Sequence, residues 1–108
     1  MNIVTLVGNL GNDPEVKSTQ SGEIVTTFSL ATKGLKDKTD WHKIVCFGKL
    51  AGVAGGNLFK GSTVAVSGML TYNTWEKDGK KITQAQIIAN RLDFISKKKD
   101  DGSKDVPF

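Results

Sequence analysis

The chain has 108 residues, a length typical of a single domain with one modest hydrophobic core. Its 15 Lys and Arg residues against 11 Asp and Glu residues give a net charge of +4, which is compatible with a polyanionic partner without requiring one. The only cysteine, Cys46, excludes an intrachain disulfide, and no apolar run is long enough to cross a membrane. We therefore expect a cytoplasmic protein without a signal peptide.

The first half of the chain predicts three strands. Residues 3–8 are a continuous apolar run, and residues 24–32 alternate between two kinds of side chain as strands do. Neither connecting stretch has such a pattern. The first strand is followed by a turn-rich segment that ends in a polar turn at 17–23, and the second by a basic loop at 33–40. Residues 40–47 combine β-branched and aromatic side chains and form the third predicted strand.

The second half predicts a short helix and two further extended segments. Apolar residues recur at helical spacing over 49–59, although three glycines weaken this helix and make it dependent on packing. Residues 62–70 predict a fourth strand, in which Gly68 marks a bend or a bulge. Residues 71–95 predict a last extended unit, whose two arms are joined by an Asp-Gly turn typical of hairpins.

The order of three strands, a helix and two strands is that of an OB-fold, a five-stranded barrel that commonly binds oligonucleotides on one face. We therefore predict an all-β domain over residues 1–95, with the short helix between its third and fourth strands. Other small β-barrels could give the same element order. Residues 96–108 show no periodicity and are predicted to form a disordered tail.

The third strand raises the question of what one of its faces does. Because side chains alternate along a strand, one face holds Trp41, Lys43, Val45 and Phe47, and the other holds His42, Ile44 and Cys46. A core would accept the two rings but not the lysine, and a face turned to solvent would gain nothing from the rings. Rings among lysines suit unpaired nucleic acid, because bases stack on rings regardless of sequence and ammonium groups attract phosphates. The rings could instead cap the barrel end or fill a subunit interface.

A third ring, Trp75, lies just before the Asp-Gly turn, on a hairpin that could project beyond the barrel. We expect bases to stack on Trp41, Phe47 and Trp75. Eight lysines in or beside the same loops and strands are candidates for phosphate contacts, although any single loop lysine could simply be solvated. They are Lys33, Lys36, Lys38, Lys43, Lys49, Lys77, Lys80 and Lys81.

Several motifs resemble those of bacterial-type single-stranded DNA-binding proteins, in the family's order and through nearly the whole chain. They are "VTLVGNLGNDPEV" at 4–16, "FSLAT" at 28–32, "DWHKIVCFGKLAGVA" at 40–54, "LFKGSTVAVSGML" at 58–70, "YNTWEKDGKK" at 72–81 and a terminal "DVPF". The resemblance implies an OB-fold, usually assembled as a homotetramer around which single-stranded DNA wraps. It also implies stacking by the three rings named above and places His42 near a subunit contact.

The resemblance assigns a second role to the end of the chain. Family members end in an acidic stretch and a Pro-Phe tip that docks on replication and repair proteins. The docking unit here would be the terminal carboxylate with Asp105, Val106, Pro107 and Phe108. The chain departs from the family pattern in two places. Leu35 stands where an aromatic residue is expected in a loop that is also shorter, and the tail is short and of mixed charge.

We therefore predict a protein that coats unwound single-stranded DNA, without sequence preference, in replication, recombination and repair. The alternative is an OB-fold adaptor of a primosome or replisome that acts mainly through protein contacts. We expect no enzyme, because the sequence has no paired carboxylates in a motif, no Ser/His/Asp set and no nucleotide-binding loop. We also expect no metal or other cofactor, because the single His and single Cys do not make a metal site. The residues leave the choice between DNA and RNA open.

Overall fold

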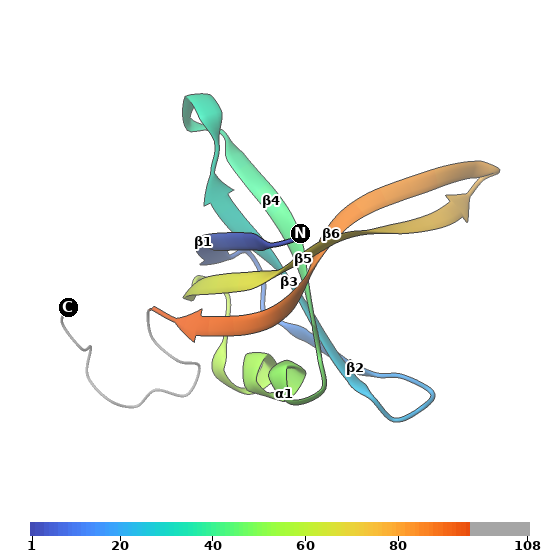
Figure 1. The fold of residues 1–108 in the computed structure, drawn as a ribbon, viewed down its shortest axis with the longest axis horizontal. Coiled ribbons are helices and arrows are strands. Elements are labelled where there is room, and N and C mark those ends of the chain that lie inside the picture. Colours follow the sequence, from blue (N-terminus) through green and yellow to red (C-terminus); the bar gives the residue numbers. More distant parts are fainter. Residues whose placement is uncertain (96–108) are drawn as a thin grey trace.

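The computed structural model describes residues 1–95, so the expected disordered tail and its docking unit lie outside the described residues. The chain forms strands, one α-helix and one 3₁₀ turn (Figure 1). In chain order the elements are β1 (Val4–Leu10), β2 (Glu15–Ser18), β3 (Ile24–Lys33), η1 (Leu35–Asp37), β4 (Thr39–Phe47), α1 (Gly48–Asn57), β5 (Thr63–Lys77) and β6 (Lys80–Phe94). Within residues 1–95, none of the helices has the length and apolar character needed to cross a membrane.

Five of the strands close into a ring, which confirms the predicted OB-fold. Hydrogen-bonded neighbours run β1–β5–β6–β4–β3, and β1 closes the ring because it pairs with β3 as well as with β5. The pairing of β4 with β6 is parallel and begins at Lys43 and Gln86, whereas the other pairings are antiparallel. The helix α1 lies between β4 and β5 in the chain, as the sequence predicted.

The inner faces of the strands and of α1 form one hydrophobic core. Phe28 of β3, Ile44 of β4 and Val64 of β5 are all buried, on the faces that alternation assigned to them. The helix covers one end of this core with the buried Ala51, whose carbonyl group accepts a hydrogen bond of 2.7 Å from the buried hydroxyl of Thr26. Packing of this kind explains how a helix with three glycines is retained.

The short strand β2 was missed by the sequence analysis, which assigned its residues to turns. All four of its side chains are exposed, so it has no alternation between apolar and polar positions. It pairs with the start of β3, from Glu15 opposite Thr27 to Ser18 opposite Ile24. Backbone pairing to a neighbouring strand therefore defines β2, and side-chain patterning does not report such pairing.

The strands β5 and β6 continue beyond the barrel as a two-stranded arm. They pair with each other as far as Lys77 and Lys80, whereas β1 pairs with β5 only as far as Gly68. Residues 71–85, here named the long hairpin, therefore project from the barrel (Figure 1). The sequence predicted that a new extended unit begins at residue 71. Residues 71–77 instead continue the fourth predicted strand.

Two local features that the sequence predicted shape this arm. Gly68 lies at an irregularity in the register of β5 and β6, where a side chain would collide with the carbonyl group of Ile88. At the tip, Asp78 and Gly79 have φ angles of 54° and 78°, as expected for a tight hairpin turn between twisted strands. The irregularity agrees with the predicted bend or bulge at Gly68, and the predicted turn is confirmed.

Candidate nucleic-acid interface

The outer face of β4 carries the two rings and the lysine that the sequence singled out. Trp41 is 61% exposed and Phe47 is 39% exposed, and Lys43 lies between them on the same face. The alternate positions Ile44 and Cys46 point into the core and are fully buried. The predicted division of this strand into an aromatic face and a core face is therefore confirmed.

Trp41 is supported from one side by the segment that follows β1. The Cζ3 and Cη2 atoms of its indole lie where a side chain at Gly11 would begin. The N–H of Gly11 donates a hydrogen bond of 2.9 Å to the carbonyl group of Ser29 on β3. The indole thus rests against a fixed piece of backbone while much of its surface stays open to solvent.

Trp75 lies on the same face of the sheet, although it belongs to the long hairpin. It pairs with Ile82, and two steps of two residues along β6 lead from Ile82 to Gln86, whose partner on β4 is Lys43. Because every second residue of a strand shares a face, Trp75 is on the outer face that Lys43 and Trp41 occupy. The structure therefore brings the three predicted rings to one side of a continuous twisted sheet, and Trp75 is 40% exposed there.

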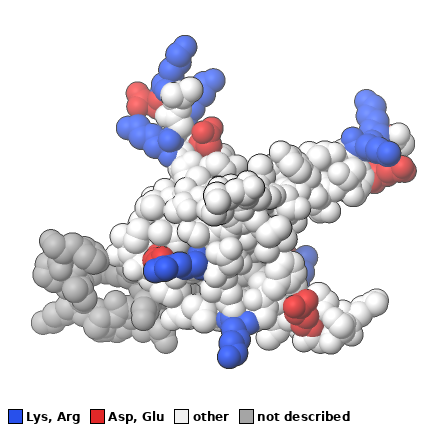
Figure 2. Space-filling view, viewed as in Figure 1, with Lys and Arg blue, Asp and Glu red and all other residues white. Residues whose placement is uncertain are grey.

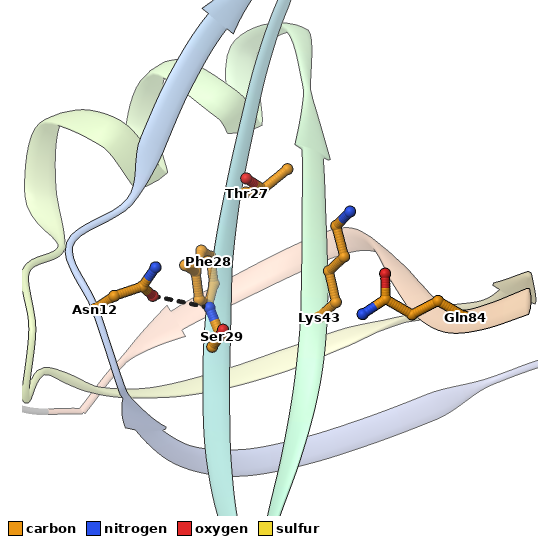
Figure 3. Close-up of a pocket in the computed structure, with 6 residues that line it drawn as sticks. All are labelled: Asn12, Thr27, Phe28, Ser29, Lys43 and Gln84. Carbon is orange, nitrogen blue, oxygen red and sulfur yellow. Dashed lines mark hydrogen bonds between the residues drawn. The ribbon is translucent and has the colours of Figure 1, made fainter. Parts of the chain in front are cut away.

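An open pocket lies on this face between the positions of the two β4 rings. Its lining residues are Asn12, Thr27, Phe28, Ser29, Lys43 and Gln84 (Figure 3). The strand register fixes its place, because Ser29 on β3 pairs with Lys43 on β4. The side chain of Asn12 accepts a hydrogen bond of 3.0 Å from the N–H of Ser29, and Gln84 extends toward Lys43 from β6 (Figure 3).

Four polar residues of this pocket were not found from the sequence: Asn12, Thr27, Ser29 and Gln84. The pairing of β3, β4 and β6 brings Thr27, Ser29 and Gln84 together, and Asn12 joins them through its hydrogen bond with Ser29. For Thr27 and Ser29 a signal existed, since alternation over 24–32 placed them opposite the core-facing residues. No comparable sequence signal marks Asn12 or Gln84.

Besides the long hairpin, β3 and β4 with the turn between them leave the barrel as a second arm (Figure 1). Basic side chains gather at the ends of both arms (Figure 2), and six of the predicted lysines belong to these ends. They are Lys33, Lys36 and Lys38 beside the β3–β4 turn and Lys77, Lys80 and Lys81 beside the turn of the long hairpin. Of the other two, Lys43 lines the pocket and Lys49 is exposed in the first turn of α1. The Nζ atom of Lys33 lies 3.5 Å from Asp37, in a pair so exposed that it holds the ammonium group only weakly.

His42 lies on the core side of β4, opposite the aromatic face, as predicted. It is half-buried, and a hydrogen bond of 2.8 Å joins its Nε2 atom to the hydroxyl of Thr32. Its expected place at a subunit contact stays a prediction. Within residues 1–95, no three His, Cys, Asp or Glu side chains are grouped so that they could hold a metal ion.

Cys46 is a core residue with an unreactive thiol, as expected for a small buried apolar side chain. It has no exposed surface, and burial raises the pKa of its thiol to about 12. The thiolate is the nucleophilic form of cysteine, so at neutral pH the group contributes packing and no chemistry.

The fold and this surface together define a class of protein: an OB-fold barrel with exposed rings and lysines on its outer face. The chain belongs to the single-strand binding protein family, whose family model matches residues 1–95.

Curated proteins of this family resemble the chain over most of its length. It is 42% identical to the single-stranded DNA-binding protein of Xanthomonas campestris pv. campestris over 104 residues, which cover 88% of this chain and 60% of that protein. It is 38% identical to the single-stranded DNA-binding protein of Xylella fastidiosa over 111 residues, covering 94% of this chain and 68% of that protein. For single-stranded DNA-binding protein 1 of Chlorobaculum tepidum the identity is 38% over 112 residues, covering 94% and 69%. The chain thus spans about three fifths of the length of the first of these relatives.

Proposed function

We propose that the chain binds single-stranded DNA without regard to sequence. The observation that carries the proposal is the common outer face of Trp41, Phe47 and Trp75, which offers three exposed rings along one sheet. Stacking of a base on such a ring contributes roughly 1–3 kcal/mol and tolerates every base, because each has a π-face. The names of the related single-stranded DNA-binding proteins support the same substrate.

The pocket supports a defined path for the backbone of the strand. Lys43 would meet a phosphate between two stacked bases, and the side-chain amides of Asn12 and Gln84 could donate to or accept from sugars and base edges. The lysines at the ends of the two arms would attract phosphates on either side of the sheet.

The residues on this face favour stacking and charge over base reading. Bidentate recognition of a base edge is most often the work of arginine, whose donors form a planar fork. The only arginine of the chain, Arg91, already donates from Nε to Asp93 at 2.9 Å. Lysine is a point charge on a flexible stem, suited to phosphates of any sequence.

Tryptophan fluorescence tests the proposal, because the only tryptophans of the chain are Trp41 and Trp75. We expect oligo(dT) to quench their emission strongly, salt to weaken the quenching, and duplex DNA of equal length to quench little. Each of the variants Trp41→Leu, Phe47→Leu and Trp75→Leu should bind oligo(dT) about 5- to 100-fold more weakly. Val16→Ala, an exposed change on β2, serves as the control. Equal affinity for duplex and single strand would refute the proposal.

We also propose that the protein assembles as a homotetramer. β1 pairs with β3 only at Asn9 and Leu10, so most of one edge of β1 has no partner strand within the described residues. Beside this edge, Ile3, Val7 and Met69 are exposed apolar residues on the outer face. An open edge next to an apolar strip suits pairing with a second copy. Sedimentation equilibrium tests this proposal, and Val7→Glu should yield smaller species.

For the end of the chain we propose docking on replication and repair proteins, with residues 1–95 acting as the DNA-binding domain. The resemblance of the sequence supports this role for Asp105, Val106, Pro107 and Phe108, which lie outside the described residues. A chain that lacks residues 105–108 should keep its affinity for oligo(dT) and lose its replication partners. Loss of DNA binding on this deletion would contradict the assignment.

A further inference from the structure

The long hairpin carries a second exposed ring, Tyr72, which the aromatic face does not include. Tyr72 lies on β5 three residues before Trp75, so the two side chains point to opposite faces of the hairpin. With 63% of its surface exposed, Tyr72 is the most open aromatic residue within residues 1–95. The hairpin therefore presents one ring on each face.

Nothing in the surroundings of Tyr72 explains this ring as a packing residue of the barrel. Its partner on β6 is Ala85, whose methyl group covers little of a phenol ring. Further along the same face, Thr74 and Thr83 share a hydrogen bond between their hydroxyl groups, 3.2 Å apart. Within residues 1–95 the hydroxyl of Tyr72 forms no hydrogen bond. A ring that is neither packed nor bonded in the protomer is available for contact with a partner.

The charges around the hairpin favour a polyanion as that partner. Lys81 lies on the face of Tyr72, because it pairs with Glu76 and both stand an even number of residues from the Tyr72–Ala85 pair. Lys77 and Lys80 flank the turn beside it. A ring next to ammonium groups is the combination that binds a nucleic acid strand by stacking and charge.

The edge of β5 offers a route between the two faces of the hairpin. The side chain of Asn2 forms two hydrogen bonds with the backbone of Leu70, of 2.8 and 2.9 Å, and so covers the edge up to that residue. Beyond Leu70, the edge of β5 that faces away from β6 has no partner strand in the described part of the chain. Single-stranded DNA that stacks on Trp75 can pass around this open edge and reach Tyr72 while it stays close to the lysines at the tip of the hairpin.

We propose that Tyr72 is a fourth base-stacking residue and that single-stranded DNA wraps the long hairpin on both faces. This inference rests on the proposed function and deepens it. The DNA segment covered by one protomer is then longer than the outer face of the sheet alone would accommodate.

Substitution of Tyr72 gives the first test, with binding followed by the quenching of Trp41 and Trp75. We expect Tyr72→Leu to bind long oligo(dT) about 5- to 100-fold more weakly and to cover fewer nucleotides at saturation. Tyr72→Phe keeps the stacking ring and should bind within about 2-fold of the unmodified chain. Val16→Ala, exposed on β2, is again the matched control.

Nitration gives a direct test, because Tyr72 is the only tyrosine of the chain. Tetranitromethane should nitrate it readily in the free protein, and saturating oligo(dT) should reduce the nitration rate at least about 10-fold if a base covers the ring. Duplex DNA should give no protection. Peptide mapping assigns the nitro group to Tyr72.

The outcomes separate this inference from the proposed function. If oligo(dT) fails to quench the tryptophans of the unmodified chain, the proposed function itself fails. If it quenches them while Tyr72→Leu binds normally and Tyr72 stays open to nitration, the stacking role of Tyr72 is overturned and the proposed function stands. A change in sedimentation of Tyr72→Leu with unchanged DNA binding would also overturn it and assign the ring to a subunit contact.

Discussion

The indole of Trp41 occupies the space that a side chain at Gly11 would need. The two residues meet because Gly11 is hydrogen-bonded to Ser29 of β3 and because Ala31, two residues further along β3, pairs with Trp41. Gly11, a residue without a side chain, therefore forms part of the candidate DNA interface. Its contribution is to hold the indole of Trp41, on β4, in a fixed orientation.

Gly11→Val should therefore weaken DNA binding, although Gly11 is not itself one of the proposed stacking or phosphate-contacting residues. The new side chain displaces the indole of Trp41 from its support, and we expect the affinity for oligo(dT) to fall about 5- to 100-fold, as for loss of the ring itself. The tryptophan emission of the free protein should shift to the red as the indole becomes more exposed. Gly56→Ala is the control, because a side chain there meets open space. Unchanged affinity of Gly11→Val would show that the support does not matter.

Lys43 should account for one phosphate contact in the salt dependence of the affinity for DNA. It lies in the pocket between the two rings of β4, where the backbone of a stacked strand would pass. For single strands, each phosphate contact contributes about −0.7 to the slope of log K against log salt, so Lys43→Ala should make the slope less negative by about 0.7. Lys17→Ala is the matched control, because Lys17 lies on β2 with its Nζ atom 2.9 Å from Glu15. Titrations at four salt concentrations measure both slopes, and equal slopes for the two variants would contradict the assignment.

Local patterns predicted the parts of the site that lie on a single element. Alternation was sufficient to put Trp41 and Phe47 on one face of β4 and Cys46 in the core, because that face depends only on the strand itself. The short helix also followed from spacing alone.

The parts of the site that depend on pairing between distant strands could not be predicted in this way. Trp75 joins the face of Trp41 only through the parallel register of β4 with β6, which no local pattern encodes. For the same reason the pocket residues Asn12 and Gln84 were not anticipated. Tyr72 lies within the motif at 72–81, but no local pattern predicts a role for it, because its exposure follows from the length of the hairpin outside the barrel.

Two glycine substitutions should change the stability of the barrel in opposite directions. A side chain at Gly68 collides with the backbone of Ile88, so Gly68→Ala should lower the free energy of unfolding by roughly 1–3 kcal/mol. Gly52 lies in α1 with open space around it, and Gly52→Ala should raise the same quantity by up to about 1 kcal/mol through helix propensity. Urea unfolding measures both. A loss of stability in Gly52→Ala would mean that α1 needs glycine for a reason other than packing.

The buried thiol of Cys46 should make the fold less stable at alkaline pH. Its pKa is about 12 in the folded protein, against 9.0 for an unperturbed thiol. As the pH rises through 9, the unfolded chain loses the thiol proton while the folded chain keeps it, so the unfolded state binds fewer protons. The contribution to stability is thus complete below pH 9 and declines between pH 9 and 12, by at most about 1.4 kcal/mol per unit.

Cys46→Ala removes this contribution and isolates it from the other titrating groups. Every other ionisable group is present in both chains and cancels in the difference between them. Between pH 8 and pH 10, the unmodified chain should lose about 1 kcal/mol more of its free energy of unfolding than Cys46→Ala does. Urea unfolding at the two pH values measures the difference. Equal losses in both chains would mean that the thiol ionises in the folded state as readily as in the unfolded one, and that water reaches Cys46 in the core.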